Sequence, residues 1–383
     1  MYLKSLALQC FRNYEEQSLE FSAPKVILVG DNGQGKSNLL EAVELLATLK
    51  SHRTPKDRDL VQRGSPSGLI RALVSSRYTV AELALLVRES GRRVLRVNQQ
   101  TVPRRLDFLG QLNAVQFSCL DLDLTRGAPE LRRAWLDGLL AQLEPVYDYI
   151  ADQYLNILRQ RNALLKHLRQ GGQMETLSPE GEAELEVWDQ QLATMGSHII
   201  RRRQRGLARL GPLAREWHQA LSSGAEVLDL VYEPNLTAPP EDKVRLEAQF
   251  REALASKRAG ELQLGTTLVG PHRDDISLWI NQTPAKAYAS QGQQRTLVLA
   301  LKLAELTLIE TVLEEPPLLL LDDVLAELDL KRQGQLLEVL QTRFQTLITA
   351  THLGRFGEKW LDSAQIFQVS AGRLSPLWRS ELV

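Results

Sequence analysis

Cysteine is scarce in this sequence: Cys10 and Cys119 are the only two among 383 residues. They form no spaced pair, so neither a disulfide framework nor a cysteine-based zinc site is expected. Such a composition fits a reducing cytoplasm. Long apolar runs are also missing, because runs such as 26–29 and 318–321 have the length of strands and fall far short of a bilayer span. No basic-then-apolar leader opens the chain, and we expect a cytoplasmic protein.

The sequence also lacks an excess of charge of either sign. Lysine and arginine total 46, aspartate and glutamate total 47, and the formal net charge is −1. This balance argues against a uniformly basic coat for nucleic acid, although it leaves room for a local basic surface. Apolar residues make up 43% and charged residues 24%, which is typical of globular proteins. The length suffices for two or three domains.

A glycine-rich loop stands between an expected strand and an expected helix. Residues 25–29 (KVILV) suit a buried parallel strand, residues 30–37 read GDNGQGKS, and a helical stretch follows. This order predicts a loop whose backbone N–H groups point at the phosphates of a nucleotide. Lys36 would reach the β- and γ-phosphates, and the Ser37 hydroxyl would ligate Mg²⁺. The alternative is a chance glycine-rich turn. The predicted nucleotide-binding residues are Gly30, Asp31, Asn32, Gly33, Gln34, Gly35, Lys36, Ser37 and Asn38.

A second half-site lies at residues 318–323, where four leucines precede two aspartates. This pattern predicts a buried strand that ends in carboxylates. Asp322 would hold Mg²⁺, and Asp323 would polarise the water that attacks the γ-phosphate. The alternative is a strand end with aspartates that only cap a helix. Lys36 and Asp322 are 286 positions apart (322 − 36), so the fold has to bring them together.

Two further polar residues stand in or after expected strands. His352 follows a strand at 346–350, and it would either sense the γ-phosphate as a third catalytic residue, with Asp323 and Lys36, or be a solvated loop residue. Gln116 stands within an expected strand. Residues 326–329 (AELD) continue into a helical stretch.

A glycine-containing turn at 290–295 (SQGQQR) runs into an amphipathic helix just upstream of the second half-site. Ser290 and the backbone N–H groups after it would form a second anion-binding helix start. Because one nucleotide already has its loop at 30–37, this helix start is predicted to serve a neighbouring subunit. Taken alone, the turn is also an ordinary N-cap. The predicted contacts in trans are Ser290, Gln291, Gly292, Gln293 and Gln294.

Between the two half-sites the spacing of the apolar residues changes. Residues 69–102 read as an antiparallel strand meander with a turn at Gly91. Apolar residues then repeat every seven positions from 136 to 168, with Arg161 as an exception, and resume between 185 and 221. We expect an antiparallel helical hairpin of about 60 Å, either a projecting arm or a packed bundle. The predicted domains are 1–127 and 262–383, the two halves of a head, and 128–261, an inserted helical arm.

The order of these motifs resembles the ABC-type ATPases, and within them the SMC/Rad50-like branch. FRNY (11–14), SHRT (51–54), LRRAWLD (131–137), GPHRDD (270–275) and SQGQQRTL (290–297) together resemble the RecF family of bacterial recombination mediators over essentially the whole chain. Two positions depart from that family. Ser37 stands where threonine is common and also supplies a hydroxyl, whereas Cys119-Leu120 stands where Pro-Glu is usual.

The resemblance implies an α/β head of the ABC type, with a mixed sheet and an antiparallel meander, plus the inserted arm. It implies ATP and Mg²⁺ as cofactors, and a homodimer in which each Ser290 contacts the partner's γ-phosphate. By the same resemblance Gln116 would be the γ-phosphate-sensing glutamine of ABC enzymes, and the alternative is an ordinary strand residue. Such a dimer would close on DNA near a single-strand/double-strand junction, promote recombinase loading at gaps, and open on slow, DNA-stimulated hydrolysis. RecR and RecO are the implied partners, in the nucleoid. The alternatives are a head acting with a nuclease and a transporter motor subunit.

Basic side chains suggest where DNA would lie. Contact with the phosphates of duplex DNA is expected, because no aromatic residues interleave with the cations as a single-strand platform requires. The densest basic run, at 201–205, reads as a solvated helix face. The DNA-binding candidates are Lys56, Arg58, Arg63, Arg104 and Arg105.

Overall fold

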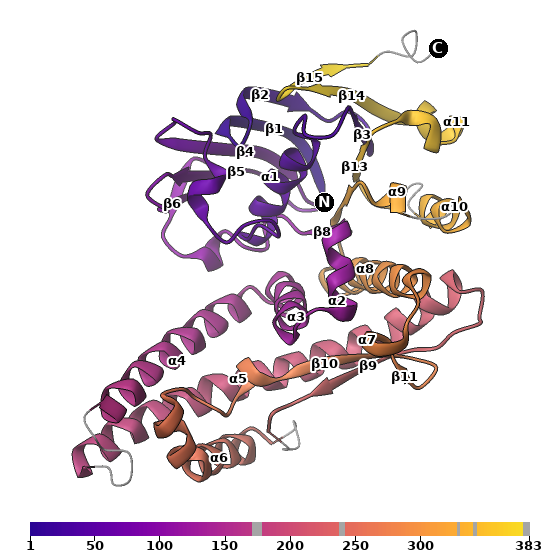
Figure 1. Cartoon of the computed structure of the whole chain (residues 1–383). Coiled ribbons are helices and arrows are strands. Elements are labelled where there is room, and N and C mark those ends of the chain that lie inside the picture. The colour runs from indigo at the N-terminus through magenta and orange to yellow at the C-terminus, as the bar shows by residue number, and fades with distance from the viewer. Residues whose placement is uncertain (171–177, 237–241, 328–329, 340–342, 378–383) are drawn as a thin grey trace. The chain divides into compact units, whose positions relative to one another are not determined.

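The computed structural model describes residues 1–170, 178–236, 242–327, 330–339 and 343–377 (Figure 1). These residues divide into two units. Unit 1 comprises Met1–Leu122, Glu216–Glu226 and Ser290–Val383, and unit 2 comprises Asp123–Arg215 and Val227–Ala289. The chain thus leaves unit 1 twice and returns. The predicted domains 1–127, 128–261 and 262–383 stay a prediction, since these units divide the chain at other residues.

The first sheet of unit 1 has the strand order β15-β14-β3-β13-β12-β8. All neighbouring strands are parallel except the pair at the β15 edge. The apolar runs of the sequence form these strands because a parallel sheet is covered on both faces. Their bounds are β3 Lys25–Val29, β8 Ala114–Ser118, β12 Leu318–Asp322, β13 Thr346–Ala350, β14 Ala364–Ser370 and β15 Arg373–Pro376. The two predicted half-sites therefore follow strands of one sheet.

The second sheet of unit 1 is antiparallel, in the order β2-β1-β4-β5-β6-β7. The meander expected at 69–102 is confirmed as its last four strands, and two N-terminal strands extend it. The bounds are β1 Tyr2–Phe11, β2 Tyr14–Glu20, β4 Ser67–Ser75, β5 Val80–Arg88, β6 Arg93–Val97 and β7 Gln100–Val102.

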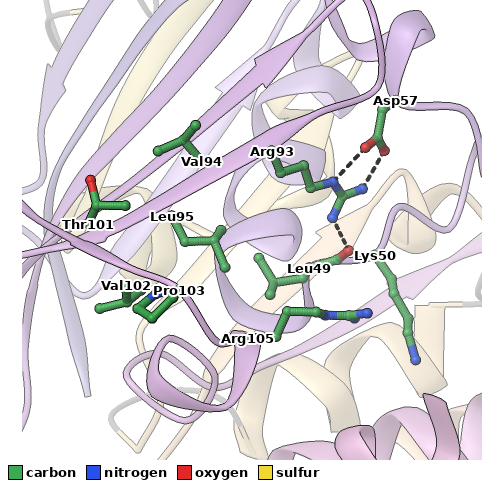
Figure 2. Close-up of a pocket in the computed structure, with 10 residues that line it drawn as sticks. All are labelled: Leu49, Lys50, Asp57, Arg93, Val94, Leu95, Thr101, Val102, Pro103 and Arg105. Carbon is green, nitrogen blue, oxygen red and sulfur yellow. Dashed lines mark hydrogen bonds and ion pairs between the residues drawn. The ribbon is translucent and has the colours of Figure 1, made fainter. Parts of the chain in front are cut away.

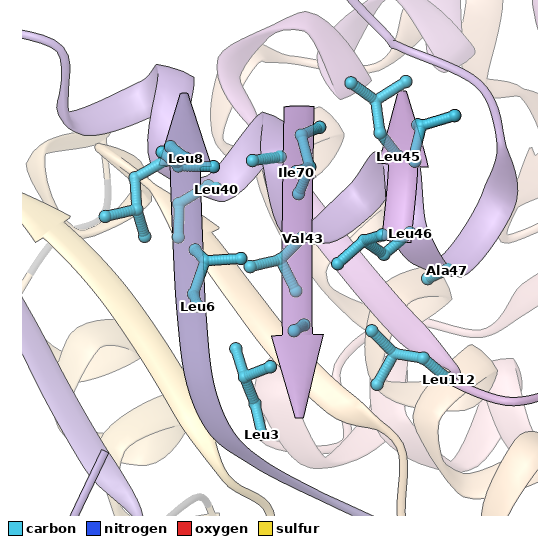
Figure 3. Packing of buried hydrophobic residues seen from close by; sticks show 14 of the residues in the cluster. Leu3, Leu6, Leu8, Leu40, Val43, Leu45, Leu46, Ala47, Ile70 and Leu112 are labelled. Carbon is cyan, nitrogen blue, oxygen red and sulfur yellow. The ribbon is translucent and has the colours of Figure 1, made fainter. Parts of the chain in front are cut away.

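Helix α1 (Lys36–Thr48) packs between the two sheets. Figure 3 shows Leu40, Val43 and Leu46 of this helix against Leu6 of β1 and Ile70 of β4. The same cluster of buried side chains includes residues of β12 and β13, so one core joins both sheets through α1. The other helices of unit 1 are η1 Asp57–Leu60, η2 Arg105–Asp107, η3 Cys119–Leu122, α8 Gln291–Leu313, α9 Val324–Glu327, α10 Leu330–Val339, η5 Leu353–Arg355 and α11 Glu358–Asp362.

Unit 2 holds the predicted helices and a small sheet that was not predicted. Its sheet has the order β11-β10-β9. Among the residues described, no helix is both long and apolar enough to cross a membrane. The bounds are α2 Asp123–Arg126, α3 Pro129–Leu143, α4 Val146–Gln170, α5 Pro179–Leu221 (whose residues 216–221 belong to unit 1), β9 Leu228–Glu233, α6 Lys243–Leu264, η4 Pro271–Arg273, β10 Asp275–Ile280, β11 Thr283–Pro284 and α7 Ala285–Tyr288.

The first long helix of the predicted hairpin is broken. The seven-residue repeat from 136 to 168 predicted one continuous helix, which is wrong, because α3 ends at Leu143 and α4 begins at Val146. Pro145 explains the break, since proline lacks a backbone N–H and disfavours the helical conformation of the residue before it. Helix α5 is continuous over 43 residues, or about 65 Å.

Arg161, the exception in the repeat, is the centre of a buried ionic cluster. Its side chain is fully buried and donates to Asp189 of α5 and to Glu261 of α6, both at 2.6 Å. It also donates to Thr267 Oγ1 at 2.8 Å. The charged position therefore joins three helices where the repeat predicted a seam of two.

Two of the motifs that carry the family resemblance meet in unit 2. Arg132 of α3 makes two 2.8 Å hydrogen bonds to the Asp275 carboxylate, and Arg133 donates to the Asp274 carbonyl at 2.5 Å. Arg203 of α5 donates to the Pro271 carbonyl at 2.6 Å. The segments LRRAWLD and GPHRDD therefore hold α3 and α5 against the start of β10.

We predict that Arg161→Leu destabilises unit 2 by about 3–5 kcal/mol, because Glu261 would stay buried without its cation. Urea unfolding followed by circular dichroism measures this loss. Arg159→Leu is the matched control, since Arg159 is exposed on the same helix and should change stability by less than about 0.5 kcal/mol. Equal midpoints for the two variants would contradict the prediction.

Candidate nucleotide site

The glycine-rich loop turns into α1 at Gly35. Gly35 is the N-cap of α1 and has a φ of 116°. A Cβ atom at this position would lie 2.6 Å from Asn13 Nδ2, so both the backbone conformation and the space require glycine. The N–H groups of Asn38 and Leu39 donate to the Gly35 carbonyl at 3.0 and 3.3 Å and start the helix.

The Lys36 side chain lies inside the turn of the loop. It is 4% exposed, and its Nζ donates to the carbonyls of Gly30 at 2.6 Å and Asp31 at 2.9 Å. Both acceptors are neutral carbonyls, and the Lys36 ammonium forms no ion pair with any residue that the structure describes. An anionic ligand in the loop would find this charge in place.

Asp322 joins three elements at the carboxyl edge of the parallel sheet. Its Oδ1 accepts hydrogen bonds from Ser37 Oγ at 2.7 Å and from Thr349 Oγ1 at 2.8 Å. The structure thus brings the two predicted half-sites together, although they lie on α1 and β12. Carboxylate and hydroxyl oxygens are ligands that Mg²⁺ prefers, so this donor set fits the cation.

Asp323 has an unusual backbone. Its φ is 55°, in the left-handed region that residues other than glycine rarely occupy. The Asp323 N–H donates to Thr349 Oγ1 at 2.8 Å, so the same threonine holds both aspartates. Sequence reasoning missed Thr349, and the available signal was a polar residue within the buried run 346–350.

His352 and the start of the AELD segment lie shortly after strands β13 and β12. His352 is exposed and lies two residues after the end of β13, and its role stays a prediction. Ala326 and Glu327 belong to α9, whereas Leu328 and Asp329 of the predicted AELD segment lie outside the described residues.

Ser290 is exposed and caps α8. Its Oγ accepts from the Gln293 N–H at 3.2 Å, and the Gln293 Oε1 accepts from the Ser290 N–H at 2.8 Å, which completes a capping box. Gln293 Nε2 also donates to Glu226 at 2.9 Å. Of the other predicted contacts, Gln291 is exposed, Gly292 is half-buried and Gln294 is buried.

The FRNY segment supports the loop, a role that the sequence did not reveal. The buried Tyr14 hydroxyl donates to the Gly35 carbonyl at 2.9 Å. Asn13 Nδ2 donates to the Gln34 carbonyl at 2.9 Å, and Asn13 Oδ1 accepts from Asn38 at 2.7 Å. The β1–β2 turn therefore positions the loop from outside.

A histidine of the SHRT segment lies beside the loop helix. His52 Nδ1 contacts Glu44 Oε2 of α1 at 2.6 Å, and His52 Nε2 contacts Gln116 Nε2 of β8 at 3.1 Å. Burial opposes the charged form of His52, but the carboxylates around it, Glu44 first, outweigh burial and raise the pKa of the imidazole. Burial also raises the pKa of Glu44.

The basic candidates fall into two groups. Lys56, Arg58 and Arg63 are exposed on and around η1. Arg104 is exposed and pairs with Asp107 at 2.7 Å, whereas Arg105 lines a pocket of about 560 Å³.

Figure 2 shows this pocket. Arg93, one of its lining residues, binds both oxygens of Asp57 and the carbonyl of Leu49, so its charge is already paired. Apolar side chains and the two further cations Lys50 and Arg105 complete the lining. Contact of these basic residues with DNA stays a prediction.

Comparison with known proteins decides the family. Residues 2–373 match the model of the RecF/RecN/SMC N-terminal domain. The DNA replication and repair protein RecF of Synechocystis sp. is 62% identical over the whole of both chains. This chain belongs to the RecF family. The RecF protein of Crocosphaera subtropica is 58% identical over 98% of this RecF-family chain and all of the relative.

Solved structures agree with that assignment. The recombination mediator protein RecF-ATPrS in the RecFOR pathway is 32% identical, with a TM-score of 0.90 over 98% of both chains. RecF-ATP of the same pathway is 31% identical, with a TM-score of 0.89 over 98% of both chains. The Smc head domain from Pyrococcus furiosus shares only the fold. It is 16% identical, with a TM-score of 0.54 over 99% of this RecF-family chain and 97% of the Smc chain. The expected ABC-type α/β fold is confirmed.

We predict that Tyr14→Phe lowers stability by about 1–3 kcal/mol, because the Gly35 carbonyl loses its buried donor. The melting temperature measured by differential scanning calorimetry checks this. Tyr78→Phe removes the same hydroxyl from a side chain that is 77% exposed in the same unit, and it should leave the melting temperature unchanged. The prediction fails if the two variants melt together.

Proposed function

We propose that this chain is an ATP-dependent DNA-binding switch of recombinational repair. The convergence of Ser37 and Asp322, 285 residues apart, on one hydrogen bond of 2.7 Å carries the proposal. An exposed Ser290 at the start of α8 adds the second half that a dimeric ATP site requires. Two copies would close on ATP at DNA near a single-strand/double-strand junction. They would promote recombinase loading at gaps and separate after slow hydrolysis.

The residues of the loop fit ATP and Mg²⁺. Backbone N–H groups at 30–38 would hold the phosphates, and Lys36 would turn from its loop carbonyls to the γ-phosphate. Ser37 and Asp322 would hold Mg²⁺, which neutralises the developing phosphate charge when bound. Asp323 would orient the attacking water and accept its proton, and His352 would contact the γ-phosphate after β13. The RecF-ATP structure, similar over 98% of this chain, supports this assignment.

The site of one copy would be completed by the other. Ser290, with Gln291 and Gly292, would contact the γ-phosphate held by the partner copy. The chain would therefore be a weak, DNA-stimulated ATPase used as a switch. RecR and RecO are its proposed partners, because the similar solved structures come from the RecFOR pathway. We place its action in the cytoplasm at the nucleoid. Full-length similarity to RecF favours this function over a nuclease-associated head or a transporter motor.

We predict that ATP with a gapped duplex converts the monomer to a dimer, as measured by size-exclusion chromatography with light scattering. Lys36→Ala should reduce ATP affinity at least tenfold and abolish the dimer. Ser290→Arg should keep ATP binding by the monomer but prevent dimerisation, because the arginine would fill the contact to the partner's phosphate. Thr311→Arg, exposed on the same helix, is the control and should dimerise normally. A dimer formed by Ser290→Arg would refute the contact in trans.

We further predict that DNA affinity depends steeply on salt. Changing Lys56, Arg58 and Arg63 together to glutamate should weaken binding. Because each lost phosphate contact reduces the slope of log affinity against log salt by about 0.9, the slope should fall by about 2–3. Fluorescence anisotropy of a labelled duplex between 50 and 200 mM salt, about the range over which such binding weakens, measures both effects.

The control carries the same change of charge on unit 2. Arg159, Arg251 and Lys257 are exposed there and are changed together to glutamate. This variant should retain the wild-type slope. Equal slopes for the two triple variants would show that the cations around η1 do not contact DNA.

A further inference from the structure

Glu44, His52 and Gln116 form a chain of contacts that the proposed function does not yet use. It joins α1, the segment after α1 and the edge strand β8. Ser51 Oγ donates to Glu41 Oε1 at 2.5 Å, and the His52 N–H donates to Glu44 at 3.3 Å, so the backbone around His52 is fixed on α1. The imidazole therefore has a defined position between Glu44 and Gln116.

The Gln116 amide nitrogen faces His52 Nε2, and this placement sets the direction of each hydrogen bond. The ionised Glu44 only accepts, so His52 Nδ1 carries the proton and donates. The contact of His52 Nε2 with Gln116 Nε2 joins two nitrogens, and it needs the lone pair of the neutral imidazole. Gln116 must donate to it. This contact holds the Gln116 amide in one orientation, with Oε1 on the side away from His52.

The sheet register places Gln116 close to Asp322. Strands β8 and β12 are parallel, with Gln116 opposite Leu320 and Ser118 opposite Asp322. Side chains alternate along a strand, so Gln116 and Asp322 lie on the same face of the sheet. This face carries α1, since Ser37 and His52 contact these two residues. One strand and two residues separate the Cα atoms by roughly 8 Å.

The Gln116 Oε1 atom is buried, and no described residue donates to it. A buried acceptor without a donor costs about 1–3 kcal/mol. Such a cost is common where a group awaits a ligand or a reacting water. We therefore expect Gln116 Oε1 to accept a hydrogen bond from a ligand or a water that enters the site when the protein functions.

We propose that His52, held by Glu44, is a positioning residue that orients the Gln116 amide, so that Oε1 accepts a hydrogen bond from the attacking water. This inference rests on the proposed ATP function. In the reaction, the water oxygen bonds to the γ-phosphorus, and the bond to the bridging oxygen breaks with its electrons left on ADP. One water proton passes to Asp323. Gln116 holds the water in line, and His52 holds Gln116.

Two substitutions at His52 separate positioning from support. His52→Asn places an amide nitrogen near the Nδ1 position, which keeps the bond to Glu44 and loses the contact to Gln116. His52→Gln places an amide oxygen near the Nε2 position, which keeps an acceptor for Gln116. We expect His52→Asn to lower the single-turnover rate of γ-phosphate hydrolysis up to about 100-fold. His52→Gln should lose less than about fivefold.

Binding measurements complete the test. Because the role is confined to the chemical step, ATP affinity and ATP-dependent dimerisation of His52→Asn should change less than twofold. His198→Asn on α5 is the control for losing a histidine, and Glu44→Gln, which keeps an acceptor for Nδ1, should show an intermediate rate. Glu44→Gln also replaces His52→Asn if that variant does not fold.

Each outcome bears on a different claim. Equal hydrolysis rates for His52→Asn and His52→Gln, whether reduced or unchanged, overturn the positioning role. A wild-type protein that neither binds nor hydrolyses ATP overturns the proposed function instead. A selective loss in His52→Asn, with ATP binding and the dimer retained, supports the inference.

Discussion

The carboxylate of Asp322 is the interaction on which the site depends. One of its oxygens accepts hydrogen bonds from the hydroxyl groups of Ser37 of α1 and Thr349 of β13. These bonds form only if β3, β12 and β13 end together, and the register provides this, with Val29 opposite Ala350 and Leu321 opposite Ile348. Because three strands and a helix must agree, small shifts anywhere in the parallel sheet would separate the half-sites.

Local patterns explain what could be predicted from the sequence. The glycine-rich loop, the strand that ends in carboxylates and the meander could each be predicted from a short stretch of sequence. Apolar runs and glycines determine the local backbone conformation together with residues close to them in the chain. Neither Tyr14 nor the polar Thr349 in its buried run reveals its partners from sequence, because those partners are set by the register of distant strands. Arg161 interrupted a repeat, and its role depends on α6, which lies outside that repeat. Strand β9 was missed because half of its residues are only partly buried.

Helix α8 is held at both its start and its middle by residues from other parts of unit 1. Glu226 binds Gln293 in the capping box, and the buried Lys302 pairs with Asp121 at 3.0 Å. Asp121 also accepts from the Ser118 N–H at the end of β8. Contacts through Asp121 therefore link the helix that presents Ser290 to strand β8, which carries Gln116 five residues before Asp121. We therefore expect a displacement of α8 to displace β8 as well.

The position of β3 in its sheet has a consequence for biosynthesis. Its two neighbours are β13 and β14, which lie at the far end of the chain. At about 5–20 residues per second, a ribosome makes β14 roughly 17–70 s after β3. Until β13 is made, shortly before β14, the strand before the glycine-rich loop has neither neighbour. A nascent chain that ends before β13 lacks Thr349 and both neighbours of β3, so the arrangement of the site described above forms only late in synthesis.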